Sequence, residues 1–206
     1  MKRALIIFVC IIVICACSDK EYIQRFADIK YKGVDMEVKE FRIDGFYVES
    51  NKLEIDSLYH VVPIFYKDGT CVISFIKPDF YPLKKDKPIN LSEEVLKWGW
   101  ESQHWGERQG LFKINSDTIY VTVYDRDKWS IVIDRYKFKI IDSEHILLCL
   151  YERPRMKSKD DYSEKVNIEY TFVPADSIPI PDNDYLKKKK WFWENESDWK
   201  HYMESR

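Results

Sequence analysis

The chain has 206 residues with a formal net charge of −2, and 45% of these residues are hydrophobic and 16% aromatic. This composition supplies enough apolar material for a packed core and excludes a disordered chain. The near-neutral charge argues against nucleic acid as the main partner, because phosphate binding needs a clustered basic surface.

The N-terminal segment is typical of a secretory signal peptide. Lys2 and Arg3 precede an almost unbroken apolar run over residues 4–16, and the chain turns polar at Ser18. This run is shorter than the roughly 20 residues that a transmembrane helix takes. We therefore expect residues 1–16 to be a signal peptide that directs export of the chain.

The signal ends in Ile14-Cys15-Ala16-Cys17, which resembles the lipobox of the bacterial lipoprotein family. The resemblance implies cleavage before Cys17, followed by attachment of a diacylglyceryl group and an N-linked fatty acid such as palmitate. By the convention of that family, Ser18 favours the outer membrane, on its periplasmic face or at the cell surface. Ordinary signal cleavage after Ala16, which leaves Cys17 as a plain thiol, is the alternative.

Two cysteines, Cys71 and Cys149, fall in the region expected to fold. Disulfides form in exported proteins, so a bridge between Cys71 and Cys149 is one expectation. Both cysteines also lie within strongly apolar, strand-like runs, where a buried free thiol behaves as a small hydrophobic side chain. The sequence leaves both alternatives open.

Residues 17–40 are polar and mixed in charge, which indicates a lipidated N-terminus and a tether. From residue 41 on, strand-like runs alternate with turn signals. The clearest alternation places Ile119, Val121 and Val123 on one face of a strand. We expect eight strands, over residues 41–48, 59–66, 70–76, 110–114, 118–124, 129–141, 145–151 and 165–173.

Three local features are predicted within these strands. Gly45 indicates a bulge or a close approach of the backbone in the first strand. Lys67-Asp68-Gly69 indicates a hairpin, because glycine tolerates a positive φ. The apolar residues switch from odd to even positions after Ile133, which predicts a β-bulge near Asp134 and Arg135.

Two short helices accompany the strands. An inserted helix is expected over residues 91–98, with Asn90 in the N-cap position. A second helix near the C-terminus would bring Trp199, Tyr202 and Met203 onto one face. The remaining chain between residues 77 and 109 predicts a long insertion between strands.

Consecutive antiparallel hairpins with few helices indicate a mainly β protein. The favoured architecture is an eight-stranded up-and-down barrel or a strongly curved meander. Closure of a barrel removes the sheet edges that eight strands otherwise expose. A two-sheet sandwich is the competing architecture, because the number of strands does not separate the two.

Several segments resemble the small lipocalin-like lipoproteins of Gram-negative bacteria. The resemblance rests on four segments, which are residues 105–119, 41–47, 65–69 and 190–193. It implies a lipocalin-like barrel, and the stretch over residues 77–109 is longer than the compact family pattern. The predicted organisation is a signal peptide at 1–16, a lipidated N-terminus and tether at 17–40, a lipocalin-like β domain at 41–193 and a C-terminal tail at 194–206.

No sequence motif indicates catalysis or metal binding. The four histidines do not lie at metal-ligand spacing, and the sequence contains no Cys-x-x-Cys pair, phosphate-binding glycine loop or Gly-x-Ser-x-Gly motif. Asp125 and Asp127 lack the further oxygen ligands of a calcium loop, and they indicate a solvated turn. We therefore expect no enzyme activity, no cofactor and no metal.

A cluster of tryptophans is the most suggestive binding feature. Trp98, Trp100 and Trp105, with His104 among them, combine flat apolar faces with polar groups, as a platform for a sugar or an amphipathic ligand requires. The alternative is that these indoles are buried beneath the inserted helix at one end of the barrel.

The C-terminal run from Lys187 to Trp193 combines lysines with aromatic residues. Such a run suits a contact with the membrane surface. It equally suits a solvated turn that leads into aromatic residues packed on the core, and we favour this second interpretation.

The sequence thus predicts an exported, lipid-anchored protein without a catalytic site. The first expectation for its role is binding of a small apolar or amphipathic ligand, or a glycan, in the barrel mouth near Trp98, Trp100, His104 and Trp105. The alternative is an accessory protein of an outer-membrane complex, with a filled barrel and an outer surface that meets a partner protein.

Overall fold

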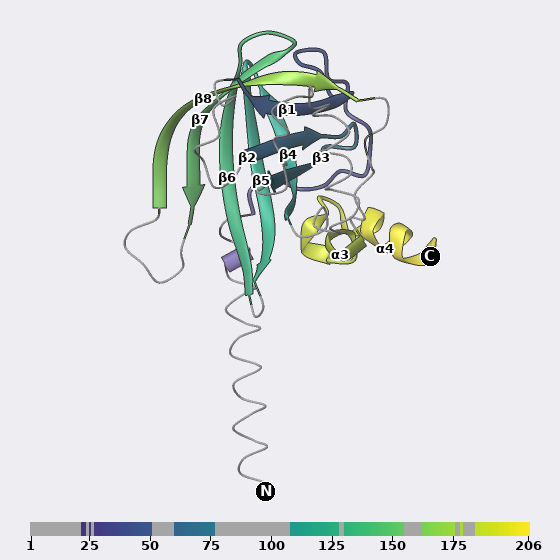
Figure 1. Cartoon of the computed structure of the whole chain (residues 1–206). Helices are drawn as coiled ribbons and strands as arrows, with labels where there is room; N and C mark the ends of the chain where they lie inside the picture. Colours follow the sequence, from purple (N-terminus) through teal and green to yellow (C-terminus); the bar gives the residue numbers. More distant parts are fainter. Residues whose placement is uncertain are drawn as a thin grey trace, which may run out of the picture.

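The computed structural model of the chain describes residues 22–23, 25, 27–50, 60–76, 108–127, 130–154, 162–175, 178 and 184–206. Within these ranges the protein is mainly β, with eight antiparallel strands in one nearly closed, barrel-like sheet and short helices at the C-terminus (Figure 1). The predicted fold class is confirmed. The inserted helix expected over residues 91–98 lies outside the described residues.

The strands follow one another as a meander that curls back on itself. The strands are β1 (Gly45–Glu49), β2 (His60–Phe65), β3 (Thr70–Ile76), β4 (Arg108–Asn115), β5 (Thr118–Asp127), β6 (Ser130–Ile140), β7 (His145–Arg153) and β8 (Tyr162–Pro174), followed by α3 (Asp184–Lys187), the 3₁₀ helix η3 (Lys190–Phe192) and α4 (Glu196–Glu204). Their order in the sheet is β1-β8-β7-β6-β5-β4-β3-β2. The two outermost strands meet because Phe46 of β1 shares a buried cluster with Val62 and Ile64 of β2.

The predicted turn and the predicted close approach are both present. Gly69 has a φ of +80° in the turn between β2 and β3, and the Asp68 carboxylate accepts a hydrogen bond from the Thr70 N–H at 3.0 Å. At Gly45, an added Cβ would lie 2.1 Å from the carbonyl oxygen of Val173. Glycine at position 45 therefore allows β1 to approach β8 closely.

The bulge predicted near Asp134 and Arg135 lies elsewhere. The pairing of β5 with β6 keeps one register throughout, whereas the pairing of β6 with β7 shifts between Lys137 and Phe138. The switch in apolar positions has another cause: Ile133 is buried on the outer face of the barrel. Ile133 is buried on the outer face and Asp134 and Tyr136 are buried on the inner face, so the apolar pattern does not report the position of the bulge.

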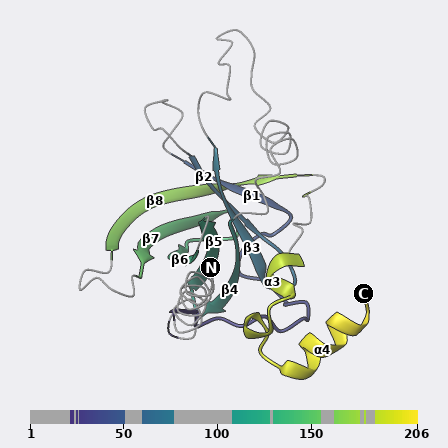
Figure 2. The same ribbon diagram turned by 90° about the horizontal axis from the view of Figure 1, so that it is seen from below.

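The N-terminal segment packs against the barrel from Tyr22 on, where a tether was expected. Its apolar side chains cover outward-facing residues of β4, β5 and β6. Side chains of α3 and of the aromatic run at η3 join this cover. The buried members of this outer cluster are Tyr22, Ile23, Ala27, Ile29, Tyr31, Leu111, Tyr124, Ile133, Leu186, Phe192 and Trp193. Figure 2 shows α3 on the outside of the barrel beside β3 and β4, with α4 farther out.

The C-terminal aromatic residues pack on the core, as favoured from the sequence. Phe192 and Trp193 are buried, and the rings of Tyr31 and Phe192 stack with centroids 5.4 Å apart. Trp199 and Tyr202 of α4 pack against the same cluster. Met203, the third residue of the predicted apolar face, is 42% exposed.

The segment over residues 36–44 crosses one end of the barrel. The Met36 N–H donates to the carbonyl of Lys67 at 2.6 Å, and the Arg42 N–H donates to the carbonyl of Ser143 at 3.0 Å. Between these two attachments, Phe41 inserts its ring into the core, 5.2 Å from the ring of Phe65. The segment therefore closes the barrel at the end formed by these two turns.

The Tyr22 hydroxyl completes the hydrogen bonding where β6 and β7 separate. It accepts from the Ile133 N–H at 3.2 Å and donates to the carbonyl of Pro154 at 2.8 Å. Proline has no N–H, so β7 cannot continue the ladder at this position. Burial raises the pKa of the Tyr22 hydroxyl, which keeps it neutral. This single group fixes residue 22 to the barrel.

We expect the Tyr22→Phe and Tyr170→Phe variants to differ in stability. The first leaves the N–H of Ile133 and the carbonyl of Pro154 without their shared partner, and it should lower the free energy of unfolding by about 1–3 kcal/mol. Tyr170 is the matched control, because its buried hydroxyl has no hydrogen-bond partner among the described residues. Its removal should leave stability unchanged or raise it. Equal losses in urea unfolding would contradict the role assigned to Tyr22.

Candidate functional site

Side chains fill the described part of the barrel interior. One buried cluster receives residues from all eight strands and from Phe41. Aromatic rings dominate it, and the ring of Phe65 lies 5.1 Å from that of Phe112 and 6.3 Å from that of Phe138. An eight-stranded barrel has an interior just wide enough for side chains to fill. The described interior is therefore a packed core.

A layer of charged and tyrosine side chains lies beyond this core, at the end of the barrel where β4 and β6 begin and β5 and β7 end. We refer to it as the charged layer. It consists of Arg108, Asp125, Asp134, Tyr151 and Arg153.

The strand register places the charged layer on the inner face of the sheet. Val123 pairs with Asp134, and Tyr136 pairs with Tyr151. Paired residues share a face of the sheet, and Val123 and Tyr136 belong to the interior cluster. Asp125 lies two residues after Val123 and thus faces the same way.

Asp134 is the centre of the charged layer and is 0% exposed. The Arg153 guanidinium donates from Nε to Oδ1 at 2.6 Å and from Nη2 to Oδ2 at 2.8 Å. The Tyr151 hydroxyl donates to Oδ1 at 3.1 Å. Arg108 lies 4.0 Å from Oδ2 of Asp134 and pairs with Asp125 at 3.0 Å.

These contacts determine the titration of the neighbouring groups. The hydrogen bonds to Asp134 raise the pKa of Arg153 and keep its guanidinium charged. Burial, reinforced by the charge of Asp134, raises the pKa of Tyr151 to about 12. The charged layer is thus a matched ion-pair network, in which the bidentate geometry occupies both carboxylate oxygens.

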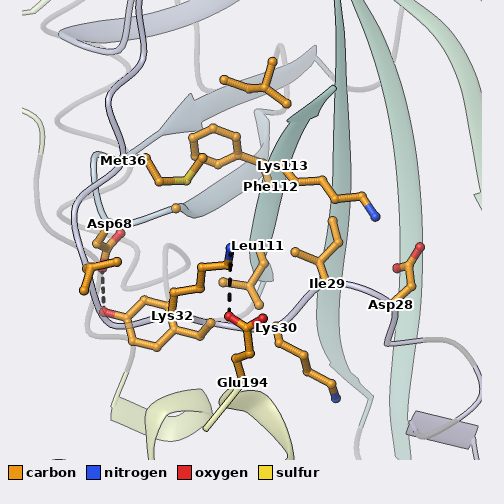
Figure 3. Close-up of a pocket in the computed structure, with 14 residues that line it drawn as sticks. Asp28, Ile29, Lys30, Lys32, Met36, Asp68, Leu111, Phe112, Lys113 and Glu194 are labelled. Carbon is orange, nitrogen blue, oxygen red and sulfur yellow. Dashed lines mark hydrogen bonds and ion pairs between the residues drawn. The ribbon is translucent and has the colours of Figure 1, made fainter. Parts of the chain in front are cut away.

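A second feature is a groove of about 370 Å³ between the N-terminal segment, β4 and the turn at Asp68 (Figure 3). Its apolar lining includes Ile29, Met36, Leu111 and Phe112. Charged side chains of both signs surround this lining: Lys30, Lys32 and Lys113 with Asp28, Asp68 and Glu194. This combination suits a peptide segment with apolar and charged side chains, rather than a free anion.

Asp68 joins the parts of the chain that form the groove. The Tyr31 hydroxyl and the Lys187 ammonium both donate to its Oδ2, at 3.2 Å and 3.3 Å. Burial, followed by the charge of Asp68, raises the pKa of Tyr31. These bonds hold the N-terminal segment, the β2–β3 turn and α3 together, so the groove is formed in advance of any binding.

The turn at Gly33 exposes an apolar side chain at the edge of the groove. Gly33 has a φ of +71°, and an added Cβ would lie 3.0 Å from the Trp193 ring. The next residue, Val34, lines the groove and is 61% exposed. Lys32 forms an ion pair with Glu194 at 3.9 Å across this part of the groove (Figure 3).

The predicted site residues fall in two groups. Cys17 and the set Trp98, Trp100, His104 and Trp105 lie outside the described residues, so lipidation and the tryptophan site stay predictions.

Cys71 and Cys149, by contrast, are described and are both free thiols. Cys71 is buried in the core, where burial raises the pKa of its thiol. The structure therefore agrees with the alternative in which Cys71 is a buried free thiol.

Sequence reasoning missed the charged layer. Asp125 was assigned to a solvated turn, but it lies within β5 and pairs with Arg108. Asp134 was attributed to a bulge, but it faces the barrel interior. The available signal was an acidic residue inside a long apolar strand, with Arg153 at the end of the next strand. Only the register brings Asp134 and Arg153 together.

Comparison of the chain with protein-family models, curated proteins and solved structures gives no match. Among the described residues, no helix has the length and apolar character needed to span a membrane. The same residues contain no group of three or more His, Cys, Asp or Glu side chains placed to hold a metal ion.

We expect Arg153→Met to lower the free energy of unfolding by about 2–3 kcal/mol. Losing one partner of a fully buried pair costs about 3–5 kcal/mol, and the partial exposure of Arg153 reduces this figure. The double variant Asp134→Leu with Arg153→Met should recover most of the loss, because no buried charge is left unpaired.

Arg42→Met is the control for Arg153→Met, since Arg42 pairs with Asp44 and Glu144 on the exposed surface. Arg42→Met should lower the free energy of unfolding, measured in urea, by clearly less than Arg153→Met does. A double variant less stable than Arg153→Met alone would contradict the interpretation of Asp134 as a compensated buried charge.

Proposed function

We propose that this chain is an exported lipoprotein of the outer membrane, anchored through Cys17, that acts as a non-catalytic accessory protein of a membrane complex. The observation that carries this choice is the filled barrel. Aromatic side chains such as Phe41, Phe65 and Phe112 occupy the described interior. The outer surface is then the part of the molecule that meets a partner.

The anchoring proposal is supported by the signal sequence and the lipobox-like ending Ile14-Cys15-Ala16-Cys17. Each buried methylene of an attached acyl chain contributes about 0.8 kcal/mol to membrane binding, so several chains give a firm anchor. The anchor would not need a basic surface, which agrees with the formal net charge of −2.

The groove is the proposed contact site for a partner protein. It is preformed by the bonds to Asp68, its lining is apolar and its surrounding charges carry both signs. Val34 offers an exposed apolar side chain at its edge. The other expected role, binding of a small apolar or amphipathic ligand, depends on Trp98 to Trp105 and gains no support from the described residues.

Lipidation can be tested by labelling cells that express the full chain with tagged palmitate. The wild-type chain should incorporate the label and partition into the detergent phase after Triton X-114 extraction. Cys17→Ser should lose both properties, whereas Cys15→Ser, the matched control inside the signal, should keep them. Label retained in the Cys17→Ser chain would refute anchoring at this residue.

The partner site can be tested by co-purification from detergent-solubilised membranes. We expect a stoichiometric protein partner whose affinity falls by about tenfold or more with Val34→Glu, because a charge at the groove edge must be desolvated on binding. Ile141→Glu is the matched control, since Ile141 is 52% exposed but does not line the groove. Absence of a stoichiometric partner, or equal effects of the two variants, would refute the accessory role at this groove.

A further inference from the structure

The chain is fixed to the barrel a few residues after the proposed lipid anchor. Tyr22 and Ile23 are buried, and the Tyr22 hydroxyl bonds to the Ile133 N–H and the carbonyl of Pro154. Further along, the Thr122 hydroxyl donates to Asp28 at 3.0 Å. From Tyr22 on, the N-terminal segment therefore moves with the barrel.

The connection between this attachment and the anchor is short. Only residues 18–21 lie between Cys17 and Tyr22. A fully extended chain spans at most about 3.6 Å per residue, which limits the distance between the two Cα atoms to about 18 Å. The part of the barrel that extends beyond Tyr22 must therefore lie close to the membrane surface.

The direction of the N-terminal segment identifies that part of the barrel. Tyr22 contacts Ile133 near the start of β6, Asp28 contacts Thr122 in the middle of β5, and Tyr31 contacts Asp68 near the opposite end. The chain thus runs away from the end that carries the charged layer. Figure 1 shows the start of the purple segment beside the lower part of β5 and β6.

The strands themselves shorten the remaining distance to the membrane. From Ile133, β6 continues back to Ser130, which is about 10 Å at about 3.3 Å per residue. This length is more than half of the reach of residues 18–21. Ser130, at the start of β6, therefore lies within about 8 Å of the membrane surface even when the connection is fully extended along the strand direction.

We infer that the barrel rests on the lipid headgroups with the end that carries the charged layer, and that the short connection from Cys17 imposes this orientation. The inference rests on the proposed anchoring at Cys17. The exposed parts of Arg108 and Arg153, and Tyr162 at 47% exposure, lie at this end. Tyrosine suits the boundary between headgroups and acyl chains, and the paired arginines present no uncompensated charge to it.

The orientation also positions the groove. Its residues Asp68, Lys113 and Ile114 lie toward the opposite end of the barrel. On a barrel that stands on its charged-layer end, this groove faces away from the bilayer, where a protein partner can reach it.

The orientation can be tested with the full lipidated chain in vesicles of phosphatidylethanolamine and phosphatidylglycerol that contain a nitroxide-labelled lipid as quencher. A thiol-reactive fluorophore is attached at Tyr162→Cys, or at Ile141→Cys at the opposite end, in a Cys149→Ser background. We expect quenching to be several-fold stronger at position 162. Ser163→Cys and Lys139→Cys form a second pair of exposed positions, for use if the first pair does not fold.

A spacer variant tests the cause of the orientation. Insertion of 20 Gly and Ser residues after Glu21 adds a flexible linker with a root-mean-square end-to-end distance of about 25 Å. The difference in quenching between positions 162 and 141 should then shrink. A difference that the spacer leaves unchanged would overturn the role of the short connection.

The two proposals fail in distinguishable ways. Equal quenching at both positions in a chain that still carries palmitate would overturn the orientation and leave the anchoring intact. A wild-type chain that incorporates no palmitate would overturn the anchoring at Cys17 and the orientation with it.

Discussion

The filling of the barrel interior is the constraint on which the rest of the structure depends. Eight strands enclose a space that side chains just fill, and here rings such as Phe65 and Phe138 meet across it. Strands that curl this tightly need close backbone approaches. An added Cβ at Gly110 would lie 2.3 Å from the carbonyl of Thr122, so a larger residue would push β4 away from β5. The tight curl of the strands therefore requires both a densely packed interior and glycine at position 110.

The outer face of the barrel is also partly buried, by segments from both sides of the β region in the sequence. Leu111, Tyr124 and Ile133 point outward and are nevertheless buried, because the N-terminal segment and the C-terminal aromatic run cover them. Asp68 and the Tyr22 hydroxyl fasten these covers to the sheet. The segment that leads to the proposed anchor is thus part of the outer core, and the position of the anchor relative to the barrel follows from packing.

Most strands were predictable from sequence because they are short apolar runs bounded by turn signals, and β5 adds a clear alternation at Ile119, Val121 and Val123. Prediction failed where burial does not alternate. In β6, Ile133 is buried outward next to Asp134, which is buried inward, so the bulge was misplaced. The covering segment is fixed at Tyr22 and Tyr31 by bonds to the Pro154 carbonyl and the Asp68 carboxylate, which are far away in sequence, and no periodicity marks it. The charged layer required the register, since Asp134 and Arg153 belong to different strands.

The charges of the charged layer balance one another. Its two arginines face two aspartates, so Arg108, Asp125, Asp134 and Arg153 carry no net charge together. Such a surface has little attraction for anionic lipids, which act mainly on unneutralised lysines and arginines. The formal net charge of −2 includes Lys2 and Arg3, so removal of the signal makes the chain more acidic. On the proposed lipid-anchored chain, the orientation of the barrel would therefore come from the short connection to Cys17 and not from the charge of this layer.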